Sequence, residues 1–355
     1  MEKEIKIAGA GLSGLTAGIN LLKAGYGVVV YEQRKDVGLR FSNDFQGIVN
    51  WLTNRDVLQV LEEMNIDRNF FIAPVKKGLF FGAGLKHRAN FKCSNPILYL
   101  VKRGTNADCL DTSLKRQFTK QGGKIQYSTK SNIKNINIIA TGPRKARFVS
   151  YGYNFKTNLD DIVCEIIDKK LSPKAYAYLL IKNGQGTMAT VMTENFKDRE
   201  IYLKRTVSAF KKELDLVMKN KKRFQGFADC FLSNTAVKNG KIYTGEAAGF
   251  QDNLLGLGMF FAIRSGYLAA KSIIRKENYD DLWKKEFNSF FKATIVNRFL
   301  FELIGQGGSM FMTKVIKKHQ KDLLDLMKKG YKFDWKKKLI YPLAYLFVRK
   351  KIKCN

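Results

Sequence analysis

The pattern of hydrophobic and polar positions near the start of the chain changes its period twice. Ile5, Ile7 and Ala8 form a short apolar run typical of a buried strand. After a glycine-rich stretch, apolar residues recur at helical spacing from Leu15 to Leu22, and a β-branched run follows at 28–31. The pattern predicts a strand, a tight turn, a helix and a second strand.

Later segments extend this pattern through the rest of the chain. β-branched and aromatic residues at 151–168 and 175–192 predict strands, and the spacing at 201–219 predicts an amphipathic helix. From Asp280 onward the pattern is helical and basic. We therefore expect an α/β protein, α+β overall, with a helical, basic C-terminal part.

Gly9, Gly11 and Gly14 lie in the first predicted turn, and their spacing suits dinucleotide binding. The first glycine permits the tight turn, the second lets the backbone approach a pyrophosphate, and the third lets the helix pack closely. Glu32 ends the second strand 23 residues after Gly9, where an acid binds a ribose hydroxyl. Because a carboxylate there would repel a 2′-phosphate, the expected ligand is FAD or NAD(H) rather than NADP(H).

Three further segments resemble the flavoproteins of the geranylgeranyl reductase family. They carry an arginine with an Asp-x-x-Leu motif, a short apolar strand ending in glycine, and a glycine-rich sequence before an apolar helix. In chain order they are 100–103 with 111–114, 138–142, and 243–249 with 256–259, 265–266 and 269–270. The resemblance covers roughly residues 3–275 and implies a Rossmann-type FAD-binding domain interleaved with a β-sheet substrate domain.

The resemblance implies FAD as the cofactor. In the family, the acid at the position of Glu246 bonds the ribityl chain, and the turn at 256–258 begins a helix whose amides face the flavin pyrimidine ring. The expected cofactor-binding residues are Gly9, Gly11, Leu12, Ser13, Gly14, Glu32, Gln33, Arg103, Gly142, Glu246, Gly249, Gly256, Leu257, Gly258 and Met259.

Residues 173–182 resemble a degraded form of the reductase pattern Tyr-x-Trp-x-Phe-Pro. Tyr176, Tyr178 and Leu180 occupy its Tyr, Trp and Phe positions, and strand alternation puts them on one face. That face is either one wall of an apolar substrate tunnel or an ordinary aromatic core face. The family's cysteine near the flavin is missing here, so no role is transferred from it, and the sequence identifies no catalytic acid.

The segments predict an interleaved domain organisation. The FAD-binding domain is expected from residues 1–45, 100–150 and 238–275, the substrate domain from 46–99 and 151–237, and a helical membrane-contact region from 276–355.

Charge adds the expectation of an anionic partner, since 63 Lys and Arg outnumber 31 Asp and Glu and give a formal charge of +32. No nucleic-acid-binding module is recognisable, so no nucleic acid is expected. Ten apolar residues at 339–348 lie between the basic runs 336–338 and 349–351. They are too short to cross a bilayer, and they predict either an anchor on an anionic membrane surface or a last core helix.

The numbers and spacing of cysteines and histidines indicate the cellular compartment and limit the possible chemistry. Five cysteines without a CxxC pair favour reduced cytosolic thiols, and two histidines give little material for a metal site, so none is expected. The first residues lack the pattern of a signal peptide. These features predict a cytoplasmic, peripheral membrane protein.

Together the sequence predicts an FAD-dependent oxidoreductase that reduces carbon–carbon double bonds of geranylgeranyl or other polyprenyl chains in lipids or their precursors. NAD(P)H or a ferredoxin is the expected electron donor. Two alternatives stay open: a flavin-dependent monooxygenase or halogenase, and a non-catalytic membrane-associated flavoprotein.

Overall fold

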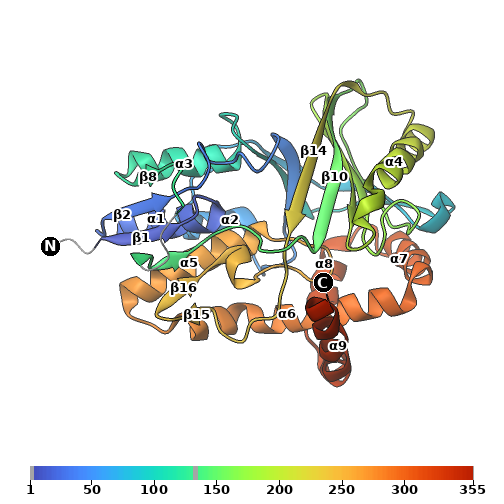
Figure 1. Ribbon diagram of the computed structural model, residues 1–355. Helices are drawn as coiled ribbons and strands as arrows, with labels where there is room; N and C mark the ends of the chain where they lie inside the picture. Colours follow the sequence, from blue (N-terminus) through green and yellow to red (C-terminus); the bar gives the residue numbers. More distant parts are fainter. Residues whose placement is uncertain (1–3, 131–134, 355) are drawn as a thin grey trace.

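A computed structural model describes residues 4–130 and 135–354, and Figure 1 shows a first sheet with its helices on the left and a second sheet on the right. The strands are β1 (Ile5–Ala8), β2 (Val28–Tyr31), β3 (Asp44–Val49), β4 (Ile72–Val75), β5 (Lys77–Phe81), β6 (Arg88–Lys92), β7 (Leu98–Arg103), β8 (Lys124–Gln126), β9 (Ile138–Ile139), β10 (Phe148–Lys156), β11 (Ile162–Ile166), β12 (Ala177–Lys182), β13 (Gln185–Met192), β14 (Lys219–Ala228), β15 (Val237–Lys238) and β16 (Lys241–Tyr243). The α-helices are α1 (Leu12–Lys23), α2 (Val57–Glu63), α3 (Leu110–Lys120), α4 (Arg199–Leu214), α5 (Met259–Arg275), α6 (Tyr279–Ile304), α7 (Gln306–Lys318), α8 (Leu323–Tyr331) and α9 (Trp335–Cys354).

The first sheet has six strands in the order β15-β16-β9-β1-β2-β8. β1 pairs in parallel with β2 and β9, and β9 pairs in parallel with β16. Apolar residues of β1 and β2 share one core with the buried faces of α1, α3 and α5. The predicted strand, turn, helix and second strand are confirmed, and they form the start of a Rossmann-type sheet.

The second sheet has seven strands in the order β14-β10-β13-β12-β11-β5-β6. One face packs on α4 through a core that includes Leu179, Met188 and Phe210. The opposite face, with Phe80 and Leu180, faces a core that also contains residues of α7 and α8. A third sheet, β3-β7-β4, contributes Val49 and Leu100 to that second core.

Two segments differ from the pattern read in the sequence. The helix expected over 201–219 ends at Leu214, because Asp215 adopts a left-handed conformation with φ of 51°. Lys219 then begins β14, which pairs antiparallel with β10. Residues 46–99 divide between two places, since α2 packs in the core of the first sheet whereas β5 and β6 extend the second. The proposed domain boundaries stay a prediction.

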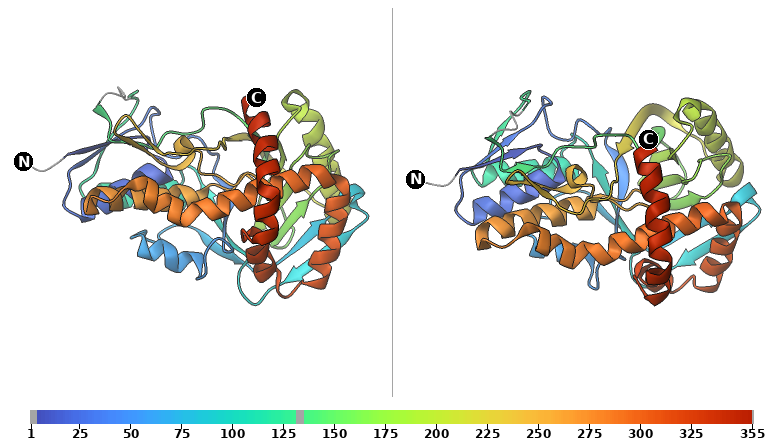
Figure 2. Two further views of the ribbon diagram at one scale, coloured as in Figure 1. Left: turned by 90° about the horizontal axis from the view of Figure 1, so that it is seen from below. Right: turned by 60° about the horizontal axis from the view of Figure 1, so that its bottom comes forward.

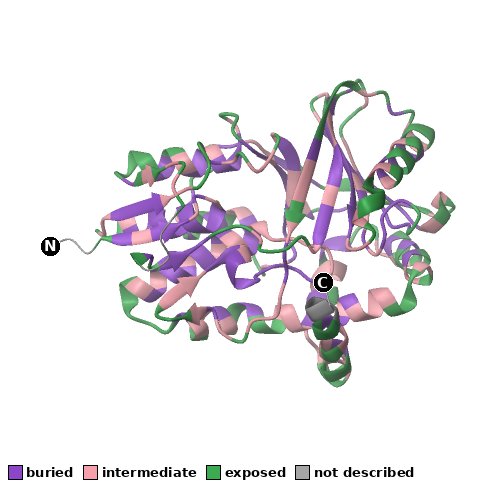
Figure 3. Cartoon of the chain, in the orientation of Figure 1, coloured by how far each residue is buried: buried purple, intermediate pink, exposed green. Residues whose placement is uncertain are grey.

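The C-terminal helices join the two halves. α6 runs beneath both halves in Figure 1, and both views of Figure 2 show α9 crossing it. Ala344 and Val348 of α9 are buried against Ile295 and Val296 of α6, while the outward side of α9 is largely exposed in Figure 3. In the described part of the chain, no helix is both long and apolar enough to cross a membrane.

Candidate functional site

The turn between β1 and α1 forms an open backbone cradle. Gly9 has φ of +102°, and a Cβ added to Gly14 would lie 2.0 Å from the Gly9 carbonyl oxygen, so both positions require glycine. A Cβ added to Gly11 would meet no protein atom within 4 Å. No side chain caps α1, and no acid lies in its first turn. The first amides of α1 therefore face space that suits a pyrophosphate.

Glu32 is held beside this cradle. Its carboxylate accepts hydrogen bonds from the backbone amides of Ala10, at 2.9 Å, and Arg34, at 3.0 Å. The acid predicted to bind a ribose therefore lies next to the glycine turn, with its orientation fixed by the backbone. Gln33, the next predicted residue, is exposed.

The second glycine-rich segment packs directly on the first. A Cβ added to Gly266 of α5 would lie 2.1 Å from the Ser13 carbonyl oxygen, and one on Gly245 would lie 3.0 Å from Ser13 Oγ. Gly245 and the middle of α5 thus lie beside the start of α1, although more than 200 residues separate them from it in sequence. The structure brings the two predicted halves of the cofactor site together.

The turn before α5 also has groups without partners. α5 begins after Gly258 with no side-chain cap and no acid in its first turn. Gln251 Oε1 and Thr244 Oγ1 are buried, and neither has a hydrogen-bond partner in the described part of the chain. A Cβ added to Gly258 would lie 3.1 Å from the Gln251 carboxamide carbon. These free donors and acceptors fit a polar ring system such as the flavin pyrimidine.

Arg40 contacts the predicted cofactor segments, although the sequence did not indicate it as a site residue. Its guanidinium forms an ion pair with Glu246 and donates to the Phe227 carbonyl oxygen. A Cβ on the predicted contact Gly142 would lie 3.6 Å from Arg40 Nη1. Arg40 and Glu246 therefore form an ion pair beside Gly142, where the ribityl part of the cofactor is expected. One arginine among 63 basic residues carries no signal in the sequence.

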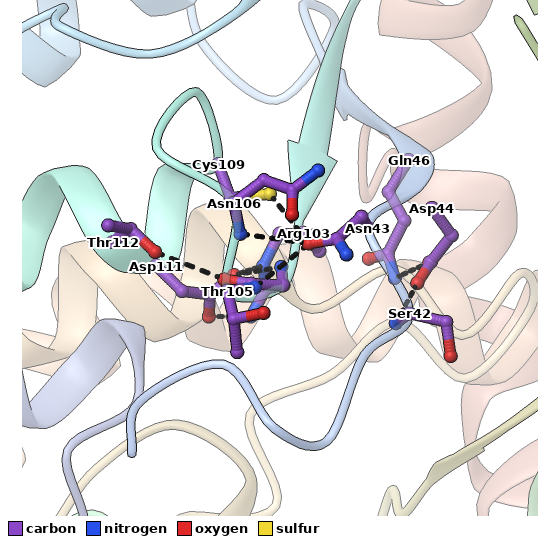
Figure 4. Close-up of polar contacts among 11 residues, drawn as sticks. Ser42, Asn43, Asp44, Gln46, Arg103, Thr105, Asn106, Cys109, Asp111 and Thr112 are labelled. Carbon is purple, nitrogen blue, oxygen red and sulfur yellow. Dashed lines mark hydrogen bonds and ion pairs between the residues drawn. The ribbon is translucent and has the colours of Figure 1, made fainter.

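Arg103 has an internal partner. In Figure 4 it makes two hydrogen bonds to Asp111, with Nε–Oδ2 of 2.8 Å and Nη2–Oδ1 of 2.9 Å, and both residues are buried. Asn43 Oδ1 accepts from the amides of Thr105, at 2.9 Å, and Asn106, at 3.0 Å. These bonds fix the loop at 38–44 against the loop at 104–109. A contact of Arg103 with the cofactor stays a prediction.

Tyr176, Tyr178 and Leu180 lie on one face, as the alternation predicts. The rings of Tyr176 and Tyr178 are 6.2 Å apart, and all three residues border the core between the second sheet and the C-terminal helices. The Tyr176 hydroxyl donates to the Leu255 carbonyl oxygen at 2.9 Å. This bond ties the tyrosine face to the turn before α5.

Two carboxyl groups that the sequence did not single out lie at this apolar face. Glu165 is the cross-strand neighbour of Tyr178, and burial raises its pKa to about 7. Asp252 accepts from the Tyr331 hydroxyl at 2.9 Å, and burial raises its pKa to about 6 against the opposing effect of its hydrogen bonds. In the described part of the chain, no side chain forms a hydrogen bond or ion pair with Glu165. Both carboxyl groups therefore have raised pKa values in an apolar setting.

The remaining predicted positions surround the same region. Leu12 and Ser13 are buried in the first turn of α1, and Leu257 and Met259 are half-buried where α5 begins. Gly249 and Gly256, in the loop before α5, have positive φ values of 80° and 71°. The fold and site together define a dinucleotide-binding protein with an adjoining apolar sheet face.

Comparisons with known proteins support this class. Residues 7–50 match the NAD(P)-binding Rossmann-like domain. Comparison with curated protein sequences gives no match.

Solved structures show the same fold over almost the whole chain. A geranylgeranyl bacteriochlorophyll reductase-like protein from Thermoplasma acidophilum has a TM-score of 0.72 at 16% identity, covering 97% of this chain and 100% of its own. A flavin-dependent brominase has a TM-score of 0.64 at 15% identity, with 99% and 100% covered. A flavoprotein/dehydrogenase from Cytophaga hutchinsonii has a TM-score of 0.59 at 16% identity, with 93% and 98% covered. The fold expected from the resemblance is confirmed.

Proposed function

We propose that the chain is an FAD-dependent oxidoreductase that reduces carbon–carbon double bonds in polyprenyl chains of lipids or lipid precursors. The Tyr176–Leu255 hydrogen bond carries this proposal, because it sets an apolar, tyrosine-lined sheet face against the turn expected to face the flavin. The likeness in fold to a geranylgeranyl reductase-like protein supports it.

The residues present fit FAD. The cradle at Gly11 would hold the pyrophosphate of FAD, and Glu32 would bind the adenosine ribose. Glu246 and Arg40 would bind the central part of the cofactor, and the amides after Gly258 would face the pyrimidine ring. When bound and reduced, FAD supplies a hydride to one alkene carbon. NAD(P)H or a ferredoxin would supply the electrons to the protein.

The chain's own residues would orient the alkene and hold the second proton. Tyr176, Tyr178 and Leu180 would pack against the chain and exclude water. Glu165 lies on the same face, and its pKa of about 7 keeps part of the population protonated at neutral pH, so its carboxyl group is our candidate proton donor to the other alkene carbon. Asp252 accepts from the Tyr331 hydroxyl and from the backbone amides of Leu254 and Leu255, which makes it a positioning group.

An anaerobic reaction tests the proposal. The chemically reduced holoprotein is mixed with a geranylgeranyl lipid without oxygen, and the flavin absorbance and product mass are followed. We expect the flavin to reoxidise as the lipid gains two hydrogens per reduced bond. A flavin that stays reduced would contradict the proposal and leave a halogenase or a non-catalytic flavoprotein.

A halogenase is the second candidate, favoured by the brominase likeness in fold over the whole chain. Its chemistry needs oxygen and a halide. Turnover that appears only after both are added, with a halogenated product, would support this candidate in place of the reductase.

Contact with an anionic membrane surface would give such a protein access to a lipid. Trp335, Leu339, Leu343 and Leu346 lie on the outward side of α9 and are 61–74% exposed. Their spacing of three or four residues makes one apolar stripe, and the buried side of the same helix packs on α6. α9 thus combines the two readings that the sequence left open, a core helix on one side and a candidate interfacial anchor on the other.

A further inference from the structure

A cavity lies between α6, α9, the segment 231–234 and the loop 248–253 that precedes α5. Its volume is about 270 Å³. None of its lining residues is acidic, although Lys284 and Lys292 both line it.

The cations lie on one side of α6. Lys284, Asn288 and Lys292 are four residues apart and line the cavity together. Lys292 lies 5.6 Å from the centre of the Tyr341 ring and has no ion pair with any described residue. Lys284 lies 3.7 Å from Asp280, whose carboxylate already accepts from Thr235, Ala236 and Trp283. The cavity therefore has an uncompensated positive charge.

α9 supplies hydroxyl donors and a further cation. Tyr341 and Tyr345 line the cavity, and the Arg349 guanidinium lies 6.0 Å from the Tyr345 ring. In the described part of the chain, the side chains of Asn288, Tyr341 and Tyr345 have no hydrogen-bond partner. Such a set of donors around lysines suits a ligand rich in anionic acceptor oxygens, as a phosphate ester is.

The same helix carries the apolar stripe of Trp335, Leu339, Leu343 and Leu346 on its outward side. Tyr341 and Tyr345 lie between that stripe and the face packed on α6, so a lipid lying along α9 could place its polar end at the cavity. We infer that this cavity binds the glycerol phosphate head group of an anionic phospholipid. The inference rests on the proposed membrane contact of α9 and uses no step of the flavin chemistry, although the expected cofactor contact Gly249 also lines the cavity.

The test compares full-length wild-type protein with Lys284→Gln/Lys292→Gln. Two readouts are used: flotation with phosphatidylcholine vesicles with or without phosphatidylglycerol, and calorimetric titration with soluble glycerol phosphate. At about 1 kcal/mol for each lysine near a membrane surface, the pair should weaken binding to phosphatidylglycerol vesicles about thirtyfold. The same double variant should no longer bind glycerol phosphate.

Two further variants separate a built site from general attraction. Tyr341→Phe/Tyr345→Phe keeps the charge and the rings but removes two donors, and should weaken phosphatidylglycerol binding about fivefold or more. Lys211→Gln/Lys212→Gln removes the same charge from the distant helix α4 and should change neither readout. Thermal melting of each variant shows that the fold is retained.

Each other outcome overturns the inference at a different point. If the double lysine substitution weakens vesicle binding and the double tyrosine substitution does not, the protein is held by general charge attraction only. Loss of glycerol phosphate binding with unchanged vesicle binding shows a site for a soluble phosphate ester. Wild-type protein that binds neither vesicles nor glycerol phosphate overturns the membrane contact together with this site.

Discussion

Gly11 and Gly14 lie three residues apart at the start of α1, yet their surroundings differ. A side chain at Gly11 would meet no protein atom, whereas one at Gly14 would collide with the backbone of Gly9. Glycine therefore serves the expected ligand at Gly11 and the packing of helix on strand at Gly14.

Gly11→Val should abolish FAD binding while leaving the melting temperature of the cofactor-free protein unchanged. Gly14→Val should lower that melting temperature, because overpacking of this kind costs about 1–3 kcal/mol or more. Flavin absorbance after gel filtration and thermal melting of both apoproteins check the pair. Full flavin occupancy in Gly11→Val would contradict the cradle.

Glu165 should make the stability of the protein depend on pH. Burial raises its pKa from the ordinary 4.5 to about 7, so the folded state takes up a proton between these values. The stability that this protonation contributes is fully present below about pH 4.5 and is lost as the pH rises through about 7. Because Glu165→Gln is neutral throughout, its free energy of unfolding should exceed that of the wild type by about 1–3 kcal/mol at pH 8.

Urea unfolding of both proteins at pH 5 and pH 8 measures this difference. The two should approach each other at the lower pH. A gap of the same size at both values would show that Glu165 does not carry a raised pKa.

Residues whose role depends on distant partners could not be predicted from the sequence. Gly9, Gly14 and Glu32 act within one local unit, so their spacing was informative. Arg40 acquires its role from Glu246, 206 residues away. Glu165 acquires its raised pKa only because the fold places its strand beside Tyr178 in an apolar face.

At the scale of elements, α9 shows why an amphipathic pattern was ambiguous. Its residues are apolar on two opposite sides, one packed on α6 and one exposed. A hydrophobic segment of this kind has no single preferred face, and only the position of α6 decides which side is covered. Deleting the helix would expose Ile295 and Val296, so substitution of the outer stripe is the cleaner test.

Leu339→Ser/Leu343→Ser should weaken binding to anionic vesicles by tenfold or more without changing the melting temperature, since each buried leucine contributes about 1.5–3 kcal/mol. Flotation and thermal melting provide the readouts. Ile201→Ser/Val217→Ser replaces exposed apolar residues elsewhere and serves as the control. Equal loss in both pairs would place the membrane contact outside α9.

For the whole molecule, the formal charge of +32 predicts a steep dependence of membrane binding on salt. Exposed charges are screened over about 8 Å at physiological ionic strength and about 3 Å at 1 M. Binding to phosphatidylglycerol vesicles should therefore fall as sodium chloride increases, towards the weaker binding to neutral vesicles that the apolar stripe of α9 provides by itself. Equal binding to neutral and anionic vesicles would mean that the charge serves another partner.

The large arrangement was predictable where sequence order and spatial order agree, as in β1, α1 and β2. It was less predictable where neighbouring segments of the sequence belong to different sheets. Residues 46–99 divide between the first and second cores because α2 and β5 present apolar faces that fit different partners. The sequence patterns show which faces are apolar and leave open which core receives them.

The order of strands in the first sheet has a consequence for biosynthesis. β9 pairs with β1 and with β16, whose residues end at Tyr243. At about 5–20 residues per second, ribosomes need roughly 10–40 seconds to extend the chain from the end of β2 to the end of β16. During this interval the first sheet cannot be completed, so its edge stays open until the second glycine segment is about to be synthesised.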